Sequence, residues 1–181
     1  MTTFDALSVV GVSGSPGKTS RSRTLLDRAL RALERLGART RQLDLAALPA
    51  DALLGRHQDP AVTDALAAVQ SGRIIVVSTP VYRATYSGLL KVFFDLLPQE
   101  ALAGKVALAI ATGATPAHFL AIDHGLRPLL ASVGALAVPT AVYGTDAQFR
   151  DGAPDTTLLD QIERAVAEAG TLAGLVPALE G

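Results

Sequence analysis

The stretch SGSPGKTSRSR, residues 13–23, gathers the side chains best suited to binding a phosphate group. Its hydroxyls and cations are Ser13, Ser15, Thr19, Ser20, Ser22, Lys18, Arg21 and Arg23. Hydroxyls and the backbone N–H groups at the start of a helix donate hydrogen bonds to phosphate oxygens, and glycine lets the backbone come close. We therefore predict a phosphate-binding loop, with a polar connection whose serine only caps the next helix as the plainer alternative.

The letters GKT at residues 17–19 also end the P-loop pattern of nucleoside triphosphate-binding proteins, but the spacing fails. That pattern requires a glycine at position 12, which is Val12, and Gly11 lies one residue too far away. The dinucleotide fingerprint Gly-x-Gly-x-x-Gly is absent as well. A phosphotransferase is therefore a distant alternative, which an ATP hydrolysis assay would test.

Two further loops offer walls for a flat ligand. In TPVYRATYSG, residues 79–88, Pro80 and Val81 give a stiff turn beside two tyrosine rings. In ATGATPAH, residues 111–118, Gly113 permits close approach of the backbone. The three loops together predict a site for a phosphorylated compound with a planar ring system.

The elements that must position these loops follow from the apolar pattern. Five short apolar runs predict strands at 7–12, 39–45, 73–79, 105–112 and 135–143. The first, third and fourth are nearly continuously apolar, as is typical of strands buried on both faces of a parallel sheet. The second begins with charge and is expected at an edge, and the fifth contains Pro139, which belongs near an edge or a bulge. Segments of helical period alternate with the runs at 26–36, 60–71, 87–97, 117–133 and 155–172.

This alternation predicts one doubly wound α/β domain over residues 1–181. Ligands of such sheets bind beyond the carboxyl ends of the strands. The phosphate-binding loop follows the first strand, and the two ring-wall loops follow the third and fourth. We therefore expect the three loops to form one site.

Composition narrows the chemistry. The 181 residues carry a formal net charge of −1, which predicts no binding to nucleic acid or to a membrane. There is no cysteine, so redox chemistry must come from a bound cofactor. The N-terminal MTTFDALSVV lacks the features of a signal peptide, and a cytoplasmic protein is expected.

Three sequence blocks carry a family resemblance: GSPxxxSRS (14–22), TPVYxxxYSGxLKxxxDLLP (79–98) and ATGxxxAH (111–118). The set resembles the NAD(P)H-dependent FMN reductases, and most of all the reductase components of two-component alkanesulfonate and methanesulfonate monooxygenase systems. The similarity runs from about residue 9 to about residue 140. It implies a flavodoxin-like three-layer α/β/α fold, with a five-stranded parallel sheet in the order 2-1-3-4-5.

The resemblance also implies which residues bind FMN. The phosphate would be held by Ser15, Ser20, Arg21 and Ser22, with a less direct charge from Lys18. The isoalloxazine and ribityl chain would lie along Pro80, Val81, Tyr82, Arg83 and Ser87, with Thr112, Gly113 and Ala114 at the far side of the ring. Gly17 stands where the family usually has arginine, and Ala114 replaces the second glycine of the usual Thr-Gly-Gly.

No catalytic side chain and no metal site are predicted. Hydride transfer from a nicotinamide to a flavin needs no protein acid or nucleophile, because the cofactors carry the reactivity. His57, His118 and His124 share no metal-ligand spacing with acidic residues. Arg21, Arg23 and Arg83 could each face the 2′-phosphate of NADPH, so the choice between NADH and NADPH stays open.

The predicted helix at 117–133 should be broken. Pro128 has no N–H to give to the carbonyl of His124, and Gly125 lies beside it, so a kink or a π-bulge is expected. The resemblance implies that His124 makes this π-bulge at an oligomer interface, in a dimer or tetramer. It also implies that Lys91 and Asp95, an i, i+4 pair, lie near a subunit contact. A kinked helix without a regulatory role is the alternative.

The resemblance implies an NAD(P)H-dependent enzyme of sulfur metabolism that reduces FMN and delivers FMNH2 to a flavin-dependent sulfonate monooxygenase. Two alternatives stay open. A quinone or azo reductase would keep its FMN through turnover. A flavodoxin-type electron carrier would bind FMN tightly, but such carriers are usually strongly acidic, and the net charge here is −1.

Overall fold

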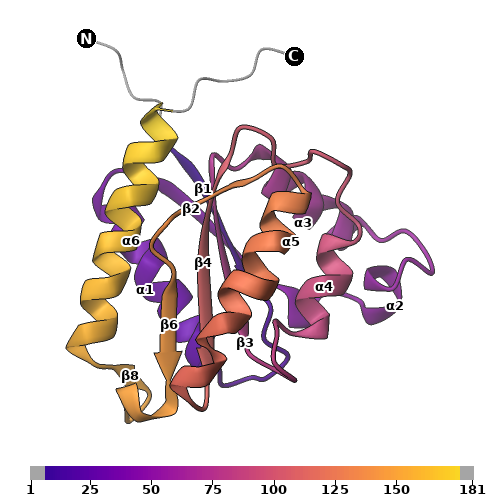
Figure 1. Ribbon diagram of the computed structural model, residues 1–181. Helices are drawn as coiled ribbons and strands as arrows, with labels where there is room; N and C mark the ends of the chain where they lie inside the picture. The colour runs from indigo at the N-terminus through magenta and orange to yellow at the C-terminus, as the bar shows by residue number, and fades with distance from the viewer. Residues whose placement is uncertain (1–6, 176–181) are drawn as a thin grey trace.

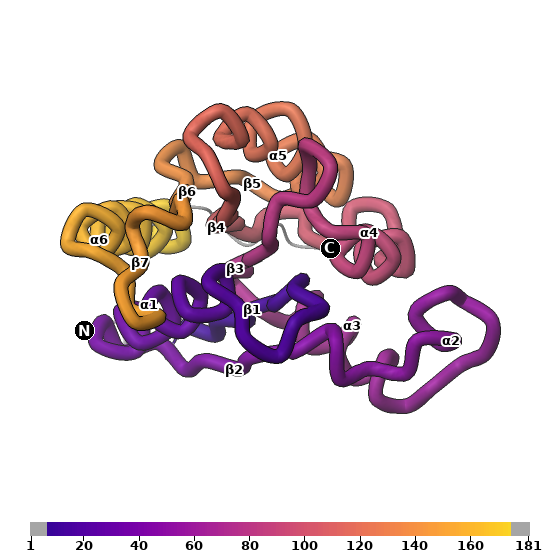
Figure 2. The backbone as a smooth tube through the Cα atoms, turned by 90° about the horizontal axis from the view of Figure 1, so that it is seen from below, coloured from indigo at the N-terminus to yellow at the C-terminus, as the bar shows by residue number. Residues whose placement is uncertain are grey.

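The computed structural model describes residues 7–175 and shows a central sheet between two layers of helices (Figure 1). Two parts of the predicted domain lie outside the described residues, 1–6 and 176–181. The first of them belongs to the N-terminal stretch that is expected to hold no signal peptide. Helices α1 and α6 cover one face of the sheet, and α3, α4 and α5 cover the other (Figures 1 and 2). The predicted three-layer α/β/α architecture is confirmed.

The sheet is parallel throughout. Its strands are β1 (Ser8–Ser13), β2 (Arg39–Asp44), β3 (Ile74–Pro80), β4 (Val106–Gly113), β5 (Leu136–Ala137) and β6 (Val142–Thr145). They are paired in the order β2-β1-β3-β4-β5, with β6 also paired to β4. This is the flavodoxin-like strand order, as predicted.

The burial of the central strands explains their nearly continuous apolar sequence. Every residue of β4 is buried, and β3 is buried up to Pro80, because helices cover both faces. Strand β2 is at the edge and largely exposed, as its charged residues predict. The polar residues at the carboxyl ends of β1, β3 and β4 therefore lead out of a rigid, apolar platform.

The predicted fifth strand, 135–143, is wrong as one element. It is divided into β5 and β6, since Pro139 between them has no N–H for a sheet hydrogen bond. Glu168 of helix α6 supports the break by accepting hydrogen bonds from the N–H of Thr140 at 2.9 Å and its hydroxyl at 2.6 Å. These bonds lower the pKa of the Glu168 carboxyl, the hydroxyl more than the N–H.

Four predicted helices are present, although α1 begins before the predicted 26–36 and α4 ends before the predicted end at 97. They are α1 (Arg21–Arg35), α3 (Pro60–Ser71), α4 (Gly88–Phe94) and α6 (Thr156–Leu175). Ser20, Asp59 and Ser87 cap the first three by accepting a hydrogen bond from a first-turn backbone N–H. Among the described residues, no helix is both long enough and apolar enough to cross a membrane.

The predicted break in the segment 117–133 is confirmed, and it is a π-turn. A 3-10 turn (η2, Pro116–Phe119) is followed by a π-helical turn (η3, Ile122–Leu126) and helix α5 (Arg127–Ser132). The N–H of Arg127 donates to the carbonyl of Ile122, five residues earlier. His124 is exposed within this turn.

Several short elements have no counterpart in the predicted set. They are η1 (Leu45–Ala47), α2 (Ala50–Leu53), η4 (Asp146–Gln148), β7 (Phe149–Arg150) and β8 (Ala153–Pro154). Strands β7 and β8 pair as an antiparallel hairpin between β6 and α6. This hairpin matters for the site.

Candidate cofactor-binding site

The three predicted loops meet at one cavity of about 730 Å³ beyond the carboxyl ends of β1, β3 and β4. Four segments line it: residues 15–24, 80–82, 112–114 and 146–152. The first three belong to the predicted loops, and the fourth, which includes the start of the β7–β8 hairpin, does not. Figure 2 shows the hairpin beside the start of α1.

The first wall, which we call the cradle wall, consists of the lining residues between 15 and 24. They are Ser15, Gly17, Thr19, Ser20, Arg21 and Thr24. The Ser20 hydroxyl accepts a hydrogen bond from the N–H of Arg23 at 3.3 Å and shares one with the Ser22 hydroxyl at 3.0 Å. Because Ser20 caps α1, the cradle wall includes the first turn of that helix, with its N–H groups and positive dipole end.

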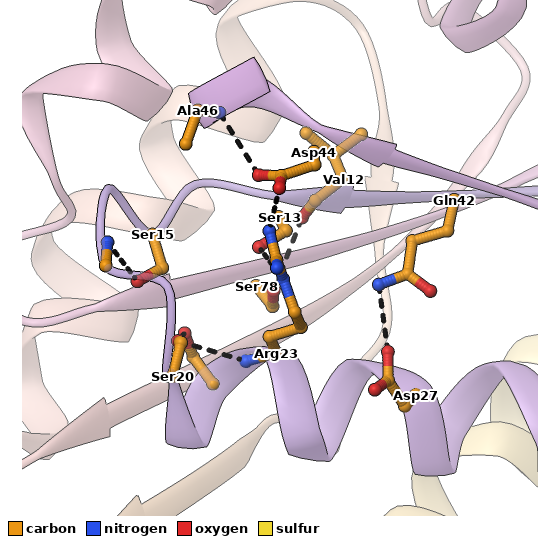
Figure 3. Close-up of polar contacts among 12 residues, drawn as sticks. Val12, Ser13, Ser15, Ser20, Arg23, Asp27, Gln42, Asp44, Ala46 and Ser78 are labelled. Carbon is orange, nitrogen blue, oxygen red and sulfur yellow. Dashed lines mark hydrogen bonds and ion pairs between the residues drawn. The ribbon is translucent and has the colours of Figure 1, made fainter.

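Arg23 has a different role from its neighbours. Its guanidinium forms an ion pair with Asp44 at the end of β2, and its Nε lies 3.5 Å from the Ser13 hydroxyl (Figure 3). Asp44 in turn accepts a hydrogen bond from the N–H of Ala46 at 3.1 Å. Arg23 therefore ties the cradle wall to β1 and β2, and it is not among the residues that line the cavity.

The second loop presents Pro80, Val81 and Tyr82 to the cavity. The Val81 N–H donates to the Thr112 carbonyl at 2.7 Å, which fixes this loop against the end of β4. Tyr82 and Thr85 exchange backbone hydrogen bonds across a tight turn, and half of the surface of Tyr82 is exposed. That ring is free to cover a flat ligand.

The same turn holds Arg83 and Ala84 in the left-handed region, with φ of 49° and 70°. Two consecutive residues with positive φ cost free energy in a chain without glycine there, and such backbone is common at functional sites. Arg83 is exposed at the tip of the turn and does not line the cavity.

Ser87, predicted to lie along the flavin, does not line the cavity and is buried between the first and second loops. Its hydroxyl donates to the carbonyl of Gly14 and accepts from the N–H of Leu90 at 3.1 Å. A Cβ on Gly14 would lie 2.9 Å from the Cβ of Leu90, so this contact leaves room only for glycine. The cradle wall and the second loop are thereby held as one unit.

Thr112, Gly113 and Ala114 form the far side of the cavity. A Cβ on Gly113 would lie 2.4 Å from the hydroxyl of Tyr143, which donates to the Thr115 carbonyl at 2.7 Å. Burial, and then the negative charge of Asp146, raises the pKa of Tyr143, so the hydroxyl keeps its proton. Gly113 is required because the backbone passes so close to this tyrosine.

Residues 146–152 line the cavity beside the start of α1, and we call them the acidic wall. Its lining residues are Asp146, Phe149, Asp151 and Gly152. Arg21 crosses to it: one guanidinium nitrogen lies 2.8 Å from Asp146 Oδ1, and the guanidinium carbon lies 5.8 Å from the centre of the Phe149 ring. No local sequence signal marks the acidic wall, because only the tertiary fold brings it to α1.

The sequence-predicted residues divide into two groups. Those that line the cavity are Ser15, Ser20, Arg21, Pro80, Val81, Tyr82, Thr112, Gly113 and Ala114. Those that do not line it are Lys18, Ser22, Arg83 and Ser87. Lining residues outside the predicted set are Gly17, Thr19, Thr24, Asp146, Phe149, Asp151 and Gly152.

Lys91 and Asp95 form an exposed ion pair at 2.5 Å on α4, away from the cavity lining. The hydrogen bond to Asp95 raises the pKa of Lys91. Gly125 of the π-turn does contact the second loop, since a Cβ there would lie 2.4 Å from the Thr85 hydroxyl. The π-turn therefore packs directly on the loop that carries Tyr82.

The lining fits a phosphorylated ring compound. Hydroxyls and a helix start stand at one end, and the stiff turn at Pro80–Tyr82 and the small residues 112–114 stand at the other. The volume suits a ligand of cofactor size. Over residues 7–175 no cluster of histidine, aspartate and glutamate could hold a metal ion.

Comparison with known proteins agrees with this geometry. Residues 7–149 match the family described as NADPH-dependent FMN reductase. An Escherichia coli protein named FMN reductase (NADPH) is 40% identical over 144 residues, covering 79% of this chain and 75% of that protein. The NADH-dependent FMN reductase SfnF of Pseudomonas fluorescens is 38% identical over 149 residues, covering 80% of each chain.

A solved structure is similar as well. The apo form of the NADH:FMN oxidoreductase EMOB superposes with a TM-score of 0.85 at 36% sequence identity. The match covers 96% of this chain and 91% of that one. Relatives named for NADPH and for NADH are therefore both similar to this sequence.

Proposed function

This chain belongs to the family of NADPH-dependent FMN reductases, and from that premise we propose that it releases reduced FMN to a partner enzyme. Family membership makes it an oxidoreductase with FMN and NAD(P)H as cofactors. The release of FMNH2, the partner and the roles of individual residues form the proposal.

The cradle wall would hold the FMN phosphate. Ser15, Ser20 and Arg21 carry the donors, and the N–H groups of the first turn of α1 add more. The ring system would lie between Pro80–Tyr82 and residues 112–114, where a half-exposed Tyr82 can cover it and exclude water. Hydride acceptance from a nicotinamide is the chemistry that bound FMN supplies, and the protein only has to align the two rings.

One observation supports the proposal that the flavin is released. In the part of the chain that the structure describes, Arg21 is the single lysine or arginine that lines the cavity, and it is already paired with Asp146. Tight retention of a phosphate dianion usually uses several charge-assisted hydrogen bonds. A cavity with one paired cation therefore favours exchange of FMN with solution.

The partner would be a flavin-dependent monooxygenase acting on a sulfonate, a proposal supported by the three sequence blocks described above. The assembly would be a homodimer or homotetramer, with the exposed π-turn at His124, and the Lys91–Asp95 pair, near the contact between subunits. Deletion of His124 should change both the sedimentation behaviour and the rate of FMN exchange. Unchanged values of both would remove the π-turn from the proposal.

The test of the function is a coenzyme oxidation assay on protein dialysed free of flavin. We expect oxidation of NADH or NADPH that saturates with added free FMN, and the better substrate identifies the preferred coenzyme. Flavin that stays bound through dialysis while turnover proceeds would contradict release. Absence of FMN binding would overturn the assignment of the cavity.

A further inference from the structure

The acidic wall places negative charge where the proposed ligand is also negative. Asp146 and Asp151 both line the cavity beside the cradle wall. Over the described residues, the lining holds these two carboxylates against the one cation, Arg21. The site proposed for a phosphate dianion is therefore lined by more acidic than basic side chains.

We propose that Asp146 is an affinity-determining residue that weakens the binding of FMN, and that Asp151 assists it. The inference rests on the proposed function, because it requires the FMN phosphate to face the cradle wall. In this inference the acidic wall repels the negative phosphate of the flavin, and FMN therefore exchanges with solution more readily.

Two effects of the Asp146 carboxylate act in this direction. It repels the phosphate charge, and it occupies one guanidinium nitrogen of Arg21 at 2.8 Å. Both side chains are half exposed, so solvent and salt reduce the interaction without abolishing it. The expected effect on affinity is therefore moderate.

The opposite effect would be that Asp146 orients Arg21 for the phosphate. The structure argues against this, because Arg21 has a second support in the ring of Phe149, 5.8 Å from its guanidinium carbon. Arg21 should therefore keep its place when the carboxylate is neutralised. The two effects predict changes of opposite sign in FMN affinity.

Replacing Asp146 should leave the acidic wall itself folded. The N–H and hydroxyl of Thr145 both donate to Gln148 Oε1 at 3.1 Å, and the Asp155 N–H donates to the Gln148 carbonyl at 2.9 Å. Strands β7 and β8 add their own pairing. None of these hydrogen bonds uses the Asp146 carboxylate.

The test is an Asp146→Asn substitution, which removes the charge and keeps the shape. Quenching of flavin fluorescence gives the dissociation constants for FMN and for riboflavin, which lacks the phosphate. We expect the constant for FMN to fall about fivefold and that for riboflavin to stay unchanged. The gain should shrink as salt is raised, and the variant should retain more FMN after dialysis.

The matched control is Asp51→Asn. Asp51 forms an exposed ion pair with Arg56 at 2.7 Å, comparable to that of Asp146, but on α2, far from the β7–β8 hairpin in Figure 2. This variant should bind FMN as the wild type does. Equal tightening of FMN in both variants would mean that only the net charge of the protein matters, and would overturn the role of Asp146.

A third variant, Ser20→Ala, separates the inference from the proposed function. If this variant weakens the binding of FMN but not the binding of riboflavin, the phosphate faces the cradle wall. An unchanged or weakened FMN affinity in Asp146→Asn would then overturn the inference alone. If Ser20→Ala leaves the preference for FMN over riboflavin intact, the placement of the phosphate is wrong, and the proposal for Asp146 falls with it.

Discussion

The cradle wall and the acidic wall line one cavity and meet at the Arg21–Asp146 ion pair, yet they differ in chemistry and in how they are held. The cradle wall presents hydroxyls and a helix start, and two contacts fix it: the buried hydrogen bond from Ser87 to Gly14 and the partly exposed ion pair of Arg23 with Asp44. The acidic wall presents two carboxylates and is attached by a hairpin of two short strands, β7 and β8, and by surface contacts. The first suits binding of a phosphate, and the second opposes it.

This difference separates stability from affinity. A change in the cradle wall disturbs partly buried, hydrogen-bonded polar groups, so it should lower both the free energy of unfolding and the affinity for FMN. A change in the acidic wall removes exposed charge, so it should alter affinity with little effect on stability. The following variants test that separation, from the largest expected effect to the smallest.

Ser87→Ala should have the largest effect. The serine is 1% exposed, and its loss leaves the Gly14 carbonyl without its donor and the N–H of Leu90 without its cap. We expect the free energy of unfolding to fall by about 2–3 kcal/mol, measured by urea denaturation. The control is Ser132→Ala, since Ser132 only donates to the Leu129 carbonyl of its own helix. Equal losses of unfolding free energy in both variants would contradict the role of Ser87 in holding the two loops together.

Ser20→Ala should raise the dissociation constant for FMN about tenfold and lower the free energy of unfolding by about 1 kcal/mol. Both effects are expected because the Ser20 hydroxyl caps α1 and also lines the cavity. Fluorescence titration and urea denaturation measure the two effects. A loss of stability without a loss of affinity would show that Ser20 only caps α1 and that the FMN phosphate does not face the cradle wall.

Glu168→Gln tests the support behind the acidic wall, because Glu168 fixes the chain at Thr140, just before β6. Hydrogen bonds from Thr140 lower the pKa of the folded carboxyl. A lowered folded pKa stabilises the protein above the ordinary glutamate value, and that stability is lost as the pH falls through the folded value.

The Glu168→Gln variant should therefore lose about 1 kcal/mol or less at neutral pH, after allowance for solvent screening. Its stability should also depend less on pH in the acidic range than that of the wild type. Urea denaturation at neutral and acidic pH measures both. Parallel pH profiles for the two proteins would contradict the coupling.

Asp151→Asn should give the smallest change. Asp151 lines the cavity, but no ion pair joins it to Arg21. Removing its charge should lower the dissociation constant for FMN by about twofold, with no change in stability. An effect larger than that of Asp146→Asn would reverse the assigned order of the two carboxylates.

The sequence was informative where the signal is local. Hydroxyl spacing and the stripe of α1 predict the cradle wall, and Pro128 predicts a kink or a π-bulge, because each depends on neighbours within one or two helical turns. Ser87 shows a limit: the sequence places it beside the cavity, but packing against Gly14 decides that its hydroxyl points away.

Other features depend on distant parts of the chain. The apolar pattern of 135–143 continues through Pro139 and predicts one strand; Pro139 indicates an edge or a bulge there, but not the division into β5 and β6. The acidic wall reaches the cavity only because β6 pairs with β4 and returns the chain to α1. Arg21 and Asp146, 125 residues apart, become partners through the topology of the sheet.

The most direct test of the central claim is the binding of FMN and riboflavin to the wild-type protein, followed by fluorescence at two salt concentrations. A phosphate held at the cradle wall predicts that FMN binds more tightly than riboflavin, that this preference weakens as salt is raised, and that dialysis removes the flavin. Equal affinities for the two flavins at both salt concentrations would contradict a phosphate site at the start of α1.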